Sequence, residues 1–145
     1  TVAWGGDVTE DGFTRMGLGI AYDVKKVRSM AGTDADRWFK LSSTEKKSKL
    51  DSLGVDAPEI VPTQEMRQEA FDNWETTDDH GMVIFGIAKD KNGREYYMVK
   101  NSWGEYGDYK GIWYMSKNYV AYKTMSFMVN KNAIPKDIRK KLGLN

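Results

Sequence analysis

The sequence predicts an α+β fold in which an antiparallel sheet is flanked by helices. An apolar run over 82–88 meets Asn92-Gly93 and is followed by a second strand-like run, a pattern typical of a β-hairpin. Shorter strand-like runs follow over 111–115 and 124–129. The stretch of about 28–75 is instead polar and predicts a helical insertion in the sheet-forming chain.

The chain opens with a strand and continues into polar helical sequence. Residues 1–8 alternate weakly and are rich in small side chains, so we expect a strand that loosens at its glycine pair. In "SSTEKKSKLDSLG", Ser42 and Glu45 stand at the spacing of a capping box, and Gly54 can end the helix. This segment is predicted to be a surface helix.

A second helix is predicted after the "DAPEIVP" break, where Thr63 can cap "QEMRQEAFDNW". Its apolar residues fall on one helical face. They are Met66, Ala70, Phe71 and Trp74. We expect this face to pack against the rest of the domain, with Phe71 and Trp74 in the core.

The hairpin carries the chain's only histidine at its head. We expect the apolar run 82–88 to form a buried strand. Antiparallel pairing then places the start of that strand opposite the end of its partner, so that His80 and Asn101 can touch. After two more strands, Pro135 opens a final helix with Ile138 and Leu142 on one face.

The composition excludes several classes of function. Twenty-two basic and twenty-one acidic residues nearly cancel, so no global field favours nucleic acid or an anionic membrane. No apolar stretch approaches the roughly 18 residues of a membrane span. The opening "TVAWGGDV" is already strand-like, and we expect it to start within a longer protein.

The chain has no cysteine, which removes disulfides, thiolate metal sites and any cysteine nucleophile of its own. A zinc site would need three carboxylates around His80, a rare ligand set, so we expect no metal and no cofactor. The lack of cysteine favours a reducing compartment such as the cytoplasm over an exported, periplasmic form.

His80 and Asn101 are a candidate catalytic pair. An amide oxygen that accepts from one ring N–H holds a neutral histidine in one tautomer and leaves the other nitrogen free as a base. A thiol is the natural partner, because a thiolate and an imidazolium stabilise each other. Trp103 could cover the contact, and Gly81 leaves room for a substrate backbone.

Structural explanations compete with this hypothesis. A lone histidine at a strand start is more often exposed or structurally satisfied. "NSWG" at a strand end would, taken alone, be a turn with a packed tryptophan. Spacing alone therefore leaves both interpretations open.

Taken together, "DHG", the hairpin, "VKNSWG" and "GDYKG" resemble the C-terminal half of papain-like cysteine peptidases. The resemblance implies that His80 is the general base, that Asn101 orients it and that Trp103 shields their hydrogen bond. It also implies that the backbone carbonyl of Asp79 accepts from a substrate N–H, with Gly81 beside it. Further matching positions are Gly107, Gly111 and Trp113.

Within that family, "VAWGGDV", the long polar insertion, Glu75 ahead of the histidine and "MVNKNAIPKDI" are similar to bleomycin hydrolase and aminopeptidase C. The resemblance implies peptide substrates and an aminopeptidase activity. Asp79 departs from that branch and matches papains, which suggests endopeptidase or dipeptide-releasing activity. The family's terminal arm is not recognisable here, which puts exopeptidase specificity and the arm's part in assembly in question.

We therefore expect residues 1–145 to be the His- and Asn-bearing part of a papain-like peptidase, inactive alone because the cysteine lies on an absent N-terminal domain. That domain, and a second copy of the chain, are its expected protein partners. An exposed apolar patch is expected around Trp4, Trp103 and the histidine edge. The alternative is a catalytically silent papain-like module that binds a peptide or a protein.

Overall fold

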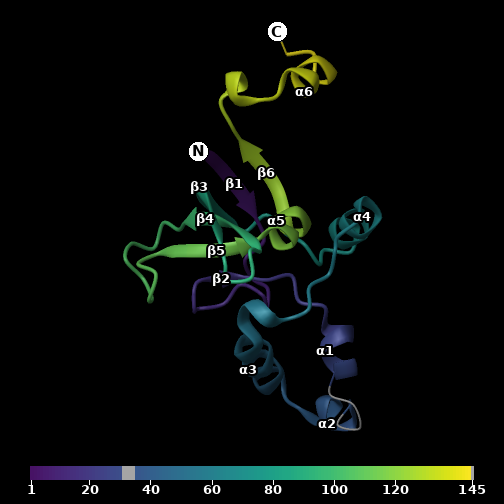
Figure 1. Ribbon diagram of the computed structural model, residues 1–145. Helices are drawn as coiled ribbons and strands as arrows, with labels where there is room; N and C mark the ends of the chain where they lie inside the picture. The colour runs from purple at the N-terminus through teal and green to yellow at the C-terminus, as the bar shows by residue number, and fades with distance from the viewer. Residues whose placement is uncertain (31–34, 145) are drawn as a thin grey trace.

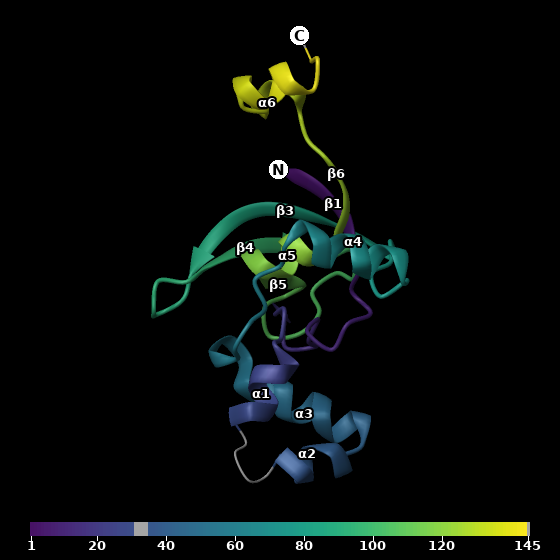
Figure 2. The same ribbon diagram turned by 90° about the vertical axis from the view of Figure 1, so that its right-hand side faces the viewer.

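The computed structural model describes residues 1–30 and 35–144. The sheet occupies the middle of the molecule, with α1, α2 and α3 below it and α6 standing off at the opposite end (Figure 1). The view turned by a quarter shows the same three levels and the long curve of β3 (Figure 2). None of the helices in these described ranges is long and apolar enough to cross a membrane.

The predicted strands and helices occur in the expected order, and the structure contains further elements. The strands are β1 (Val2–Gly6), β2 (Leu18–Gly19), β3 (His80–Lys89), β4 (Glu95–Lys100), β5 (Ile112–Ser116) and β6 (Thr124–Met128). The α-helices are α1 (Val24–Met30), α2 (Ala35–Lys40), α3 (Ser43–Leu53), α4 (Gln64–Asp72), α5 (Lys117–Lys123) and α6 (Lys136–Lys141). Short 3-10 turns cover Gly54–Asp56 and Lys131–Ala133.

The strands form one open sheet in the order β2-β5-β4-β3-β1-β6. All neighbours are antiparallel except β2 and β5, which run parallel. The predicted hairpin is confirmed: Gly93 turns with a φ of 80°, and the Asp90 carboxylate accepts from the backbone N–H groups of Asn92 and Arg94. The expected loosening at the glycine pair is also confirmed, as a register shift between β1 and β6 at Gly5 and Gly6.

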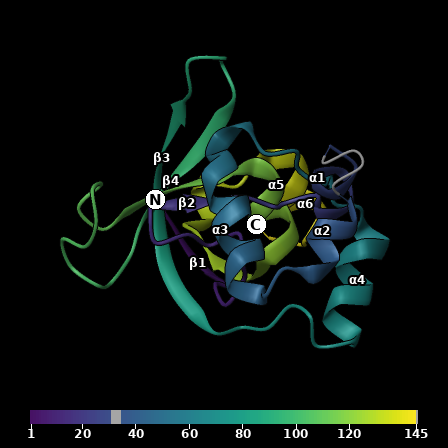
Figure 3. The same cartoon turned by 90° about the horizontal axis from the view of Figure 1, so that it is seen from below.

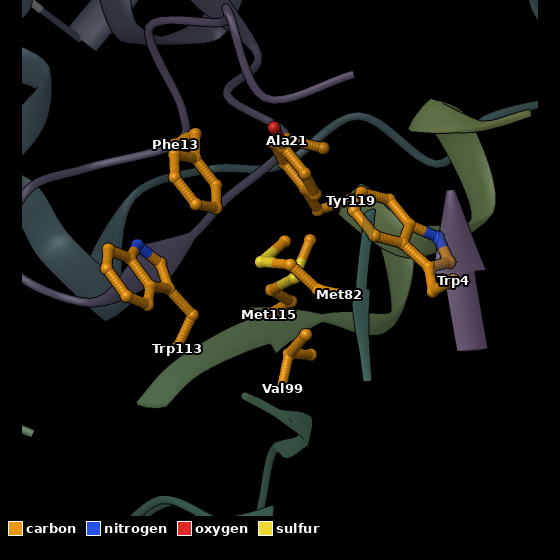
Figure 4. Packing of buried hydrophobic residues seen from close by; sticks show 8 residues of the cluster. All are labelled: Trp4, Phe13, Ala21, Met82, Val99, Trp113, Met115 and Tyr119. Carbon is orange, nitrogen blue, oxygen red and sulfur yellow. The ribbon is translucent and has the colours of Figure 1, made fainter. Parts of the chain in front are cut away.

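The main core lies between the sheet and the segments that cross it. Trp113 stacks on Phe13 with ring centroids 5.2 Å apart, and Met115 and Val99 are fully buried beneath them (Figure 4). Trp4 belongs to this core and is 2 % exposed, and its indole N–H donates to the Thr124 hydroxyl. The prediction that Trp4 lies in an exposed patch is therefore wrong, whereas Trp103, expected in the same patch, is 52 % exposed.

The helical region has its own small core of Val27, Trp38 and Leu50. The predicted capping box of α3 is confirmed, because the Ser42 hydroxyl accepts from the Glu45 N–H and the Glu45 carboxylate accepts from the Ser42 N–H. Seen from below, the β3–β4 turn and the loop after β4 extend beyond these helices (Figure 3).

The prediction of Phe71 and Trp74 as core residues is wrong. Phe71 is 55 % exposed and Trp74 82 % exposed. Helix α4 ends at Asp72, so Trp74 follows it in a left-handed conformation with φ 62°. Phe71 lies about 100° around the helix axis from Ala70, and only the Ala70 side of the helix packs on the body.

The expectation of a buried strand over 82–88 is also wrong for half of its side chains. Val83, Phe85 and Ile87 are 41, 42 and 60 % exposed, while Met82 is buried and Ile84 is half-buried. The alternation arises because successive side chains of a strand point to opposite faces. An apolar run does not reveal whether both faces are covered.

Two helices were not predicted. Helix α1 begins at Val24, ahead of the polar stretch, and α5 joins β5 directly to β6. The signal for α5 is readable afterwards: the Ser116 hydroxyl caps it by accepting from the Tyr119 N–H. Its short length and its position between two strands concealed it.

Candidate active site

The structure brings His80 and Asn101 together at one edge of the sheet. His80 is the first residue of β3 and Asn101 follows the last residue of β4. The His80 Nε2 lies 2.8 Å from the Asn101 Oδ1. Antiparallel pairing of the two strands produces this contact, as the sequence predicted.

The second bond to the Asn101 oxygen fixes the direction of the first. The backbone N–H of Ser102 donates to the same Oδ1 at 2.7 Å. A flipped amide would place an NH₂ group against that N–H, so the atom that meets the histidine is an acceptor. The Nε2 of His80 must then carry the proton, which leaves its Nδ1 unprotonated in the neutral ring.

The amide is held at a cost. Asn101 is 3 % exposed, and its Nδ2 is buried without a hydrogen-bond partner among the described residues. An unpaired buried donor costs about 1–3 kcal/mol. Among the described residues, the side-chain hydrogen bonds of Asn101 are thus made through its oxygen alone.

Trp103 lies beside the histidine, as predicted. The two ring centroids are 5.2 Å apart with the planes tilted by 44°. The indole also meets Phe13, Tyr106 and Trp113 edge to face. It is 52 % exposed itself, so one of its faces borders the solvent next to His80.

Asp79 uses its side chain to fix the approach to His80. Its carboxylate accepts from the Val8 N–H at 3.0 Å and from the hydroxyls of Thr9 and Thr77 at 3.0 and 3.2 Å. Its own N–H donates to the Gly6 carbonyl at 3.3 Å. The residue before the histidine is thereby joined to the end of β1.

Asp7 makes the reciprocal connection, which the sequence analysis missed. Its carboxylate accepts from the Thr77 N–H at 2.9 Å and from both the N–H and the hydroxyl of Thr9. Burial alone would raise the pKa of Asp7, but these hydrogen bonds and the charge of Lys123 hold it below its usual value. No spacing rule links residues 70 positions apart, so only the fold reveals the pair.

A hollow of about 520 Å³ opens beside the pair. Its lining includes Gly5 and Gly81, whose side chains are absent, and Asn101 at the end nearest the histidine. A Cβ built on Gly81 would meet nothing within 4 Å. The expectation of open space beside the histidine is confirmed.

The sheet and its edge site define the papain-like class of fold. PepW of Lactobacillus rhamnosis aligns with 97 % of this chain at a TM-score of 0.54, with 19 % identity and 26 % of the PepW chain covered. Residues 49–144 match the Peptidase C1-like family. The chain belongs to that family, which confirms the resemblance stated from the sequence.

Two curated relatives are named aminopeptidases and a third is named cathepsin L1. Aminopeptidase C of Lactobacillus helveticus is 30 % identical over 74 residues, or 51 % of this chain and 16 % of the relative. Aminopeptidase G of Lactobacillus delbrueckii subsp. lactis is 33 % identical over 58 residues, covering 40 % and 13 %. Cathepsin L1 of Drosophila melanogaster is 42 % identical over 40 residues, covering 28 % and 11 %. The chain thus spans less than a fifth of each relative.

Proposed function

We propose that this chain supplies the general-base side of a cysteine peptidase active site. The observation that carries the proposal is the doubly accepting Oδ1 of Asn101, which leaves the Nδ1 of His80 as the free basic nitrogen. The chain contains no cysteine, so the thiol would come from a Cys-bearing part of the same protein outside residues 1–145.

In the proposed reaction, the Nδ1 of His80 takes the proton from the thiol. The thiolate attacks the carbonyl carbon of a peptide bond, and the imidazolium then gives its proton to the departing amine. His80 next takes a proton from water, whose oxygen attacks the thioester and displaces the thiolate from the acid. The imidazolium then returns its proton to the thiolate, which restores the thiol and the neutral His80. Asn101 keeps the ring in place throughout, without adding a negative charge.

The remaining predicted residues take supporting roles. Trp103 would limit the access of water to the His80–Asn101 bond. The backbone carbonyl of Asp79 would accept from a substrate N–H, with Gly81 leaving room for the peptide, because the Asp79 side chain already holds that segment to β1. The names of aminopeptidases C and G support peptide amino termini as the substrate, hence an aminopeptidase.

The test is peptidase activity of the full-length gene product on aminoacyl and peptidyl fluorogenic substrates. His80→Ala should lower kcat by about two to four orders of magnitude, the usual contribution of a general base. Asn101→Ala should cause a smaller loss, because the base remains but its tautomer is no longer fixed. Asn118→Ala, on α5, serves as the control and should leave kcat unchanged.

Alkylation of the thiol gives an independent reading. Iodoacetamide should react with the wild type near neutral pH and much more slowly with His80→Ala, since the imidazolium stabilises the thiolate. A folded full-length protein that binds peptides, cleaves none and alkylates equally in both forms would instead be the silent binding module.

A further inference from the structure

The hollow beside His80 has a floor made by two glycines on neighbouring strands. Gly5 of β1 pairs with Gly81 of β3 on one side and with Ser126 of β6 on the other. Two residues along the strands, Ala3 pairs with Val83 and with Met128. Paired residues point to the same face of a sheet, so these six positions form two parallel rows that line the hollow.

Two polar side chains converge where the Gly5 side chain is missing. A Cβ built on Gly5 would lie 2.6 Å from the Ser126 Oγ and 3.2 Å from the Asp78 Oδ1. A larger residue at this position would fill the space between them. Gly5 and Ser126 line the hollow, and the missing side chain of Gly5 leaves the space between the Ser126 hydroxyl and the Asp78 carboxylate free.

The carboxylate of Asp78 has no hydrogen-bond partner within the described part of the chain. Among residues 1–30 and 35–144, neither its carboxylate nor the Ser126 hydroxyl makes a side-chain hydrogen bond or an ion pair. The adjacent Asp79 differs, because its carboxylate accepts three hydrogen bonds from the β1 end and Thr77. Of these two neighbouring acids, Asp79 holds the fold and Asp78 lies beside Gly5, at the border of the hollow.

The cation that lines the hollow does not neutralise Asp78. The ammonium of Lys100 is directed to the loop after β4, where it donates to the carbonyls of Lys110 at 2.7 Å and Gly104 at 3.4 Å. The outer row of the hollow, Val83 and Met128, is apolar and exposed. The Asp78 carboxylate thus adjoins the hollow at Gly5, while the outer end of the hollow is apolar.

We propose that Asp78, assisted by the Ser126 hydroxyl, binds a positively charged group of the substrate in this hollow. The proposal rests on the proposed peptidase function and adds a specificity-determining residue to it. A protonated amine has this chemistry, and it can come from the free amino terminus of a peptide or from a lysine side chain. A charge-assisted hydrogen bond from ammonium to carboxylate fits both.

The test compares wild type with Asp78→Asn in the full-length gene product, using four peptide substrates. The variable position is the residue that precedes the one whose carbonyl belongs to the scissile bond. Two substrates carry lysine there and two carry its uncharged analogue norleucine. Within each pair, one substrate has a free amino terminus and the other an acetylated one. Asp137→Asn on α6, a helix that contributes no residue to the lining of the hollow, is the matched control. Equal melting temperatures establish that the variants fold.

Asp78→Asn should raise KM for the charged group that binds, lowering kcat/KM about tenfold with little change in kcat, the size expected for one solvent-accessible charged hydrogen bond. A loss confined to free amino termini identifies the terminus as the ligand, and a loss confined to lysine identifies the side chain. The loss should shrink at high salt. Equal kcat/KM of Asp78→Asn and wild type on all four substrates would overturn the proposal.

Binding separates this proposal from the peptidase hypothesis. The same four peptides with an N-methylated scissile amide are titrated into full-length wild type and Asp78→Asn by calorimetry. Weaker binding of the charged peptides to the variant supports the role of Asp78 even if the protein cleaves nothing. If the wild type cleaves the substrates but the wild type and Asp78→Asn bind the N-methylated peptides with equal affinity, the peptidase hypothesis stands and the role of Asp78 is rejected.

Discussion

At the residue scale, single side chains with several hydrogen-bond partners hold the sheet edge that carries His80 in place. Lys123 is one of them, with a side chain that is 4 % exposed. Its ammonium donates to the Glu10 carboxylate at 2.5 Å, the Thr76 hydroxyl at 3.0 Å and the Glu75 carbonyl at 3.2 Å. It thereby ties α5 to the segment that leads into His80.

Lys123→Met should destabilise the fold by about 2–4 kcal/mol, because removing one partner of a buried pair leaves the other charge uncompensated. Lys117→Met is the matched control on the same helix. Its ammonium pairs with Glu95 but is 53 % exposed, and such surface pairs contribute about 0–1 kcal/mol. The free energies of unfolding from urea titration decide, and equal losses would contradict the structural role of Lys123.

Glu59 should make stability depend on pH. Its carboxylate accepts from the Ser116 hydroxyl and from the Ala21 N–H. Burial nevertheless raises its pKa above the ordinary 4.5, because the hydrogen bonds only partly offset the desolvation. A raised pKa in the folded state means that the folded form holds this proton more tightly, so its contribution to stability is full below pH 4.5 and is lost as the pH rises through the folded-state pKa.

Glu59→Gln should therefore flatten the fall in stability above pH 4.5 and leave the protein at least as stable at pH 7. The amide oxygen can still accept from Ser116 and Ala21 without carrying a charge. Urea titrations at several pH values between 4 and 7.5 provide the measurement. A variant with the same pH slope as wild type would show that Glu59 is not the source.

At the scale of elements, the polar helices depend on their ends more than on apolar stripes. Helix α3 buries only Leu50 along its length. Its start is instead fixed by the Ser42–Glu45 capping box, in which each side chain accepts from the other's backbone N–H. Isolated helices of this length are marginal in water, so the cap contributes to its persistence.

Ser42→Ala should lower the free energy of unfolding by about 1 kcal/mol, the usual cost of losing an N-cap. Ser48→Ala, on an exposed position within the same helix, should be neutral or slightly stabilising because alanine is the better helix former. Urea denaturation of the two variants supplies the comparison. A larger loss in the free energy of unfolding from Ser48→Ala than from Ser42→Ala would mean that the N-cap does not determine the stability of α3.

The whole molecule is an open sheet with uncovered apolar surface. Phe85 and Ile87 on β3 are 42 and 60 % exposed, and Phe127 and Met128 on β6 are 67 and 77 % exposed. Exposed apolar side chains of this kind mark places where another protein surface binds. We propose that another protein surface, such as a second copy of the chain, covers this apolar surface.

The isolated chain should therefore self-associate, and Phe85→Thr combined with Ile87→Thr should weaken the association while keeping strand propensity. Val61→Thr is the control, since this residue is 75 % exposed outside the sheet. Sedimentation velocity at several concentrations measures the effect. A wild-type chain that stays monomeric throughout would contradict this prediction.

The amino-acid sequence by itself determined the hairpin, the glycine turn, the capping box and the pairing of His80 with Asn101. These follow from local rules: turn residues require particular φ values, caps act within one turn, and antiparallel strands joined by a tight turn bring their far ends together. The family could be recognised from the same short segments for that reason.

Only the tertiary structure decided which apolar residues are buried and which carboxylates hold the site. Trp4 proved buried, while Phe71, Trp74 and half of β3 proved exposed. The bonds of Asp7 and Asp79 join segments about 70 residues apart, and the Gly5 floor of the hollow depends on three strands meeting. Burial and long-range hydrogen bonds depend on which surfaces meet in space, and no local pattern encodes that.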